Sequence, residues 1–148
     1  MMKKEAGFTL VEVLAVIVLL GLLLSMIWNV LVQNAFQQKR VEDEIDVNDS
    51  AKALLNNISD IVMEQNPPVV KEKEFVSDDI VERLVFNNDI VLEKSSENSY
   101  LLGDKEYKYI KEVRANINDN GRGMTVIIIG DNDRAKVELN GTFYTRNT

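Results

Sequence analysis

The feature that most limits what this chain can fold into is a long apolar run near its N-terminus. The run from Phe8 to Val32 is 25 residues long and is broken early by one carboxylate, Glu12. As an α-helix it would be roughly 37 Å long, enough to cross a hydrocarbon core of about 30 Å. Lys3 and Lys4 precede the run, and basic residues keep such an end in the cytoplasm. We therefore expect a single-pass membrane helix with its N-terminus cytoplasmic and the C-terminal domain outside.

Two ordinary explanations compete for this run. A cleaved secretory signal peptide has a shorter apolar core and ends at a small-residue cleavage site. This run is longer, and the stretch Ser25-Met26-Ile27-Trp28 offers no clear site of that kind. A plain signal anchor fits the length but does not explain Glu12, because a charge inside an apolar span is costly unless it is paired or protonated.

Glu12 gains a partner if the chain is cut between Gly7 and Phe8. The new amine of Phe8 would be a cation at the start of a helix. The same amine on a neighbouring subunit could neutralise Glu12 across a helix–helix contact. The unpaired charge of Glu12 would then destabilise the isolated subunit in the membrane, and its pairing would favour docking onto a neighbouring subunit.

The ten residues from Lys3 to Glu12, KKEAGFTLVE, resemble the class III signal of type IV prepilins and pseudopilins. That pattern is a short basic leader, then Gly-Phe-Thr-Leu-x-Glu, then an apolar helix, and the match covers roughly the first 32 residues. The resemblance implies removal of leader residues 1–7 by a prepilin peptidase after Gly7, N-methylation of Phe8, and assembly through Glu12. The implied partners are other pilin or pseudopilin subunits, the peptidase, an inner-membrane assembly platform and membrane lipid.

The helix is predicted to continue past the apolar run. Residues 33–46 contain neither Pro nor Gly, and beyond them apolar residues recur at helical spacing. We expect one helix from about Phe8 to Met63, with 8–32 as the transmembrane and assembly half and 33–65 as an amphipathic half. Pro67 and Pro68 end it, because proline lacks a hydrogen-bond donor and clashes with the preceding turn. The recurring apolar residues are Val47, Ala51, Leu54, Leu55, Ile58, Ile61 and Val62.

Residues 66–148 change to short strand patterns separated by turn residues, which predicts an antiparallel β-rich globular domain. Asn140-Gly141 is the strongest two-residue hairpin signal, and Tyr107 and Tyr109 are expected to share one strand face. The predicted fold class is α+β, a pilin-like fold with one long N-terminal helix packed on an antiparallel sheet. The expected strands are 80–86, 90–94, 100–102, 107–110, 112–117, 124–129, 135–139 and 142–145.

Charge and composition narrow the possible functions. Residues 41–148 contain 22 acidic and 13 basic residues, a net charge of −9, which disfavours binding to nucleic acid. The chain has no Cys and no His, which excludes disulfides, thiolate zinc sites and histidine-based catalysis. The oxygen-rich loops at 118–121 and 130–133 lack the spacing of a calcium loop, so turn chemistry explains them better. We expect neither catalytic residues nor a cofactor or metal.

The leading hypothesis is a structural subunit of a type IV pilus, a competence pseudopilus or a type II secretion pseudopilus. The missing mid-helix proline, the missing cysteine pair and the modest β-domain favour a minor subunit over the major one. The subunit would leave the inner membrane for an extracellular or periplasmic filament. The alternative is a filament-tip adhesin or DNA-binding pilin displayed by the same machinery. A large insert or a basic, aromatic patch would favour that alternative, and the sequence shows neither.

Overall fold

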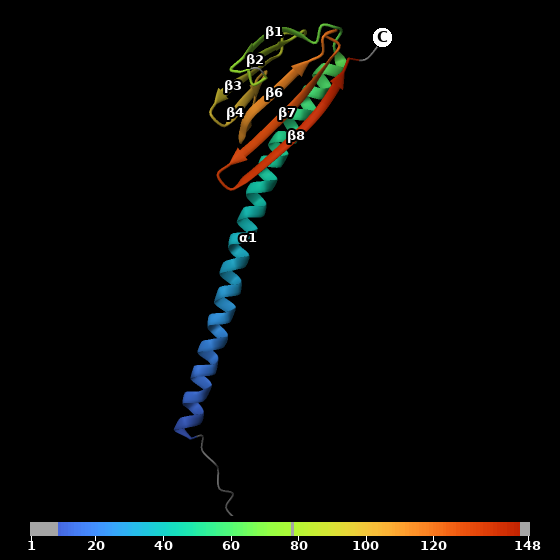
Figure 1. Cartoon of the computed structure of the whole chain (residues 1–148). Helices are drawn as coiled ribbons and strands as arrows, with labels where there is room; N and C mark the ends of the chain where they lie inside the picture. Colours follow the sequence, from blue (N-terminus) through green and yellow to red (C-terminus); the bar gives the residue numbers. More distant parts are fainter. Residues whose placement is uncertain (1–8, 78, 146–148) are drawn as a thin grey trace, which may run out of the picture. The chain divides into compact units, whose positions relative to one another are not determined.

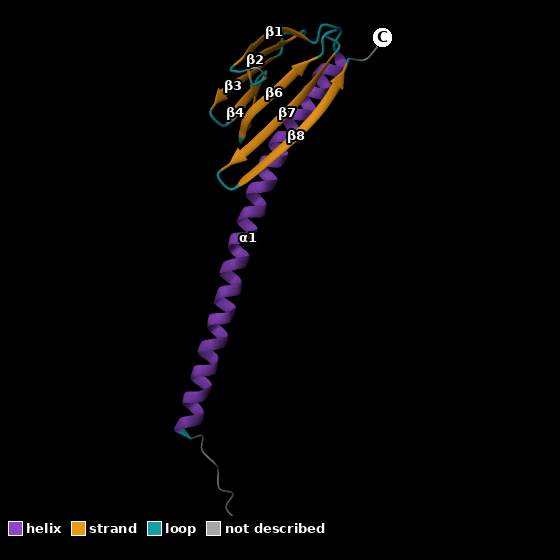
Figure 2. Cartoon of the chain, in the orientation of Figure 1, coloured by secondary structure: helices purple, strands orange, loops and turns teal. Residues whose placement is uncertain are grey.

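The computed structural model describes residues 9–77 and 79–145, which form one helix followed by eight strands (Figures 1 and 2). The helix, α1, runs from Leu10 to Glu64. The chain divides into two compact units, residues 1–39 and 40–148, and α1 contributes to both. The α+β fold class is confirmed.

Helix α1 agrees with the prediction of one uninterrupted helix. Gly21 lies inside it without breaking it, and its last residue, Glu64, precedes the proline pair. The predicted start at Phe8 lies outside the described residues. In the second unit the helix buries one face, because its apolar residues recur every three or four positions. The buried residues of that face are Val47, Ala51, Leu54, Ile58 and Val62.

The first five strands form one antiparallel sheet in the order β1-β2-β3-β4-β5. Short turns join neighbouring strands, and Gly103 takes φ 61° between β4 and β5, a conformation that glycine adopts without strain. The strand bounds are β1 Val70–Phe75, β2 Val81–Phe86, β3 Val91–Ser96, β4 Ser99–Leu102 and β5 Lys105–Lys108.

The last three strands form a second antiparallel sheet in the order β6-β7-β8. Their bounds are β6 Ile110–Ile117, β7 Gly123–Asn132 and β8 Ala135–Tyr144. An isolated bridge between Ile80 and Arg114 connects β6 to the segment that precedes β2. In Figure 1 this sheet lies along the C-terminal part of α1, and the inner residues of β7 pack into the same apolar core as the helix.

The predicted hairpin at Asn140-Gly141 is wrong. Both residues lie inside the continuous strand β8, where they pair with Ile127 and Val126 of β7. The chain turns earlier, where the Asn132 side chain accepts a hydrogen bond from the Ala135 amide at 2.8 Å. Gly141 instead makes room for an aromatic ring, since a Cβ there would lie 2.5 Å from Cζ of Phe143.

Strand β1 was absent from the predicted strands. Its sequence, VKEKEF, has four exposed charged residues between two half-buried ends, so it lacks apolar alternation. It forms because its backbone pairs with β2 from Val70 to Phe75. The local sequence of such an edge strand does not predict it, and only its pairing with β2 identifies it. Its charged residues are typical of a sheet edge that is protected from pairing with other chains.

Candidate functional site: the N-terminal segment of α1

The first turn of α1 is closed by two side chains, Thr9 and Glu12. The Thr9 amide donates to Oε2 of Glu12 at 2.9 Å, and the Glu12 amide donates to Oγ1 of Thr9 at 3.4 Å. The Thr9 hydroxyl also donates to Oε2 at 3.1 Å. This reciprocal pattern is a capping box, which satisfies amide donors that the helix itself leaves without partners.

The capping box gives Glu12 a role within its own chain that the sequence analysis missed. The signal was present, because Thr9 and Glu12 have the T-x-x-E spacing of the motif. The bonds from Thr9 all go to Oε2. Within residues 9–77 and 79–145, no hydrogen bond reaches Oε1, so this atom can still accept from a further donor.

The predicted processing residues, Gly7 and Phe8, lie outside the described residues. Glu12 lies inside them, at the start of the helix. Its pairing with the Phe8 amine of a neighbouring subunit stays a prediction.

The segment of α1 that follows Glu12 exposes apolar side chains on every face. All large apolar residues from Leu10 to Val32 are more than a third exposed. By length and composition, α1 is the one helix in the described part of the chain that could cross a membrane. A helix that is apolar all round needs lipid or other helices around it. The Ser25 hydroxyl is satisfied locally, since it donates to the Leu22 carbonyl at 2.8 Å.

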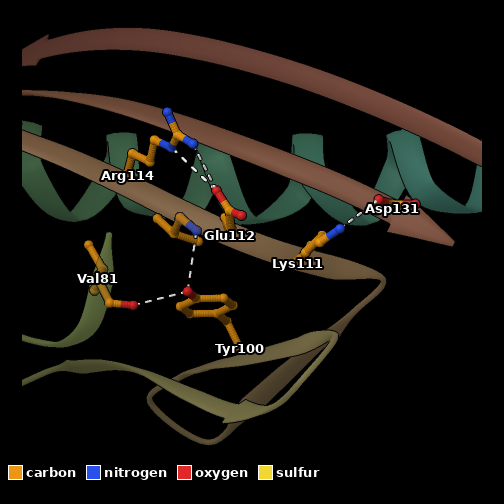
Figure 3. Close-up of polar contacts among 7 residues, drawn as sticks. Val81, Tyr100, Lys111, Glu112, Arg114 and Asp131 are labelled. Carbon is orange, nitrogen blue, oxygen red and sulfur yellow. Dashed lines mark hydrogen bonds and ion pairs between the residues drawn. The ribbon is translucent and has the colours of Figure 1, made fainter. Parts of the chain in front are cut away.

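A buried hydroxyl adds to the contacts between the two sheets of the β-domain (Figure 3). The Tyr100 hydroxyl of β4 donates to the Val81 carbonyl of β2 at 2.9 Å and accepts from the Val113 amide of β6 at 3.3 Å. Burial raises the pKa of Tyr100; the Val113 hydrogen bond opposes this, and the nearby Glu82 and Glu112 add to it. Tyr100 is therefore a neutral structural link.

The other tyrosines do not share one strand face as predicted. Tyr107 of β5 is buried and lies opposite Tyr100, so its cross-strand packing is confirmed. Tyr109 follows β5, has φ 63° and is 39% exposed. The positive φ ends the regular alternation between Tyr107 and Tyr109, because it turns the chain out of the strand.

The oxygen-rich loops use their side chains for turns. The Asn120 side chain accepts from the Arg122 amide at 3.0 Å, and Asn132 does the same for Ala135. A surface hollow of about 370 Å³ beside the second loop is lined by Ser96, Glu106, Lys108, Tyr109 and Asp131, among others. In the described ranges no group of three His, Cys, Asp or Glu residues could hold a metal ion.

Comparison with known families gives one match. Residues 2–28 match the model of the prokaryotic N-terminal methylation motif. No curated protein and no solved structure matches the chain.

The matched motif and the long apolar helix fit a type IV prepilin-like class III signal sequence. The motif thus supports a type IV pilin-family protein that is assembled after prepilin processing and associates with other pilin subunits. The apolar helix is consistent with a membrane-anchored pilin.

Proposed function

We propose that this chain is a non-enzymatic filament subunit that assembles through the N-terminal half of α1 after cleavage between Gly7 and Phe8. The observation that carries the proposal is an apolar helix with a carboxylate in its first turn. The capping box holds Glu12 at the helix start, where its unused Oε1 can meet the Phe8 amine of a neighbouring subunit. Removal of a charge from lipid would then favour the assembled state over the isolated subunit.

The subunit is proposed to be a minor one. Its helix is continuous through Gly21 and contains no proline in the apolar half. The filament would be a type IV pilus, a competence pseudopilus or a type II secretion pseudopilus. The prepilin peptidase and an inner-membrane assembly platform would be its further partners, and the filament would be extracellular or periplasmic.

Substitution of Glu12 separates its two roles. Glu12→Gln keeps the capping box, because Gln is accepted at that position, but removes the charge. Glu12→Ala removes both. We expect both variants to insert into the membrane and both to lose filament assembly, as counted by electron microscopy and sheared-fraction blotting.

Thr9→Ala is the matched control, since it weakens the cap and leaves the Glu12 charge in place. It should retain most filaments. Wild-type filament yield from Glu12→Gln would show that the charge has no role in assembly. Mass spectrometry of the mature protein should also find a methylated Phe8 at its N-terminus, and an intact Met1 in peptidase-positive cells would refute the processing step.

A further inference from the structure

The chain contains two Asn-Gly pairs, and the fold places them in different surroundings. Asn120-Gly121 lies in the turn between β6 and β7, where Asn120 is exposed and Gly121 has φ 64°. Asn140-Gly141 lies within β8, where Asn140 pairs with Ile127. An asparagine side chain can react with the backbone nitrogen of the next residue, and glycine places no side chain in the way. Backbone conformation therefore decides which of the two pairs reacts.

The Asn120 side chain is folded back over the Gly121 peptide unit. Its Oδ1 accepts a hydrogen bond from the Arg122 amide at 3.0 Å, two residues along the chain. This bond closes a ring that includes Cγ of Asn120 and the backbone nitrogen of Gly121, so the fold keeps these two atoms near each other. The same bond draws electrons away from the Asn120 carbonyl group, which makes Cγ more open to attack by a nucleophile.

We propose that Asn120 is a site of spontaneous deamidation and that the fold protects Asn140 from the same reaction. The Gly121 nitrogen attacks Cγ of Asn120 and forms a ring, a succinimide. The bond from Cγ to the side-chain nitrogen breaks, and that nitrogen leaves as ammonia with the proton from Gly121. Water then opens one of the two ring bonds to nitrogen and yields aspartate or isoaspartate. Water is the one co-reactant, and nothing is oxidised or reduced.

The backbone around each pair sets how readily the ring can form. The Gly121 amide donates to the Asn118 carbonyl at 2.8 Å, and this bond must open before the nitrogen can attack. Opening it disturbs one turn and leaves both sheets paired, so it requires only a local fluctuation. At Asn140, ten residue pairs between β7 and β8 hold the strand extended. A strand side chain stands away from its own backbone, so Asn140 reacts only when β8 leaves the sheet.

The turn at Asn120 also connects two other parts of the β-domain. The Gly121 carbonyl accepts from the Val69 amide at 3.0 Å, just after the proline pair. The Arg122 carbonyl accepts from the Thr145 amide at 2.8 Å, just after β8. Isoaspartate lengthens the main chain next to these carbonyls and adds a negative charge to an acidic domain. The modified β-domain should therefore be less stable, and the reaction needs neither an enzyme nor a partner subunit.

Mass spectrometry can follow the two pairs separately in the full-length protein. The protein is kept warm in detergent at mildly alkaline pH, and samples are digested with trypsin. The two pairs fall in different tryptic peptides, 115–122 and 137–146. Fragmentation of the first peptide separates Asn120 from Asn116 and Asn118, and it distinguishes isoaspartate from aspartate. The matched control is the same protein kept in urea, where neither pair is held by the fold.

In the folded protein, deamidation at Asn120 should exceed that at Asn140 by about tenfold or more, because a turn opens more often than a paired strand. In urea the two pairs should react at similar rates. A folded protein in which Asn140 reacts as fast as Asn120, or in which neither reacts, would overturn the proposal.

The variant Asn120→Gln tests the effect on stability, because its longer side chain would have to form a larger ring. Each protein is compared with its own fresh sample by urea unfolding. The midpoint of the aged wild-type protein should fall, whereas the midpoint of aged Asn120→Gln should stay where it was. An equal fall in both proteins would show that modification of Asn120 does not weaken the domain.

Discussion

Replacing Tyr100 by Phe tests how the two sheets of the β-domain are held together. The substitution keeps the buried ring and removes only the hydroxyl that donates to the Val81 carbonyl and accepts from the Val113 amide. Tyr100 is completely buried, so water cannot replace the lost partner at either backbone group. Each buried group left without a partner costs about 1–3 kcal/mol. Because two groups lose their partner, we expect the free energy of unfolding of the β-domain to fall by about 2–6 kcal/mol.

The measurement is urea unfolding of the full-length protein in detergent, followed by far-ultraviolet circular dichroism. The matched control is Tyr144→Phe, since Tyr144 is 61% exposed and loses a hydroxyl that faces solvent. That control should change the free energy of unfolding by less than about 0.5 kcal/mol. A Tyr100→Phe protein as stable as the Tyr144→Phe control would show that the hydroxyl does not join the sheets.

Two further predictions concern the β-domain. Because burial raises the pKa of Tyr100 in the folded state, the unfolded chain releases this proton first, at about pH 10. The contribution of the Tyr100 hydroxyl to the free energy of unfolding should be complete below about pH 10 and decline above it. The urea midpoint of Tyr100→Phe should therefore fall less above about pH 10 than the midpoint of the wild-type protein. Gly130→Ala should destabilise the domain by about 1–3 kcal/mol by overpacking. The reason is that a Cβ at Gly130 would lie 2.6 Å from Cγ1 of Val47. Gly21→Ala, where a Cβ meets no atom within 4 Å, should leave the urea midpoint of the domain unchanged and serves as the control.

Local sequence signals predicted the helix and most strands because each is set by nearby residues. Apolar spacing from Val47 to Val62 predicted the buried face of α1, and the proline pair predicted its end. The expected strands leave gaps at 87–89 and 103–106, and the residues Asp89 and Gly103 in these gaps adopt positive φ. Patterns of this kind need no knowledge of the rest of the fold.

The errors arose where pairing partners decide the outcome. Asn140-Gly141 has the composition of a hairpin, but ten residue pairs between β7 and β8 keep it within a strand. Strand β1 is charged and becomes a strand only through β2. The capping box was missed for another reason. Glu12 was interpreted only as the partner of an amine on a neighbouring subunit, so its spacing from Thr9 was overlooked.

Length, hydropathy and the order of residues are enough to specify an apolar helix with a carboxylate at its start. The sequence also determines the acidic character of the β-domain. Which side of α1 the β-domain covers depends instead on contacts between residues far apart in the chain. Val47 is buried and Ile45 is exposed because the sheets contact one side of the helix, and that contact depends on strand pairing far along the chain.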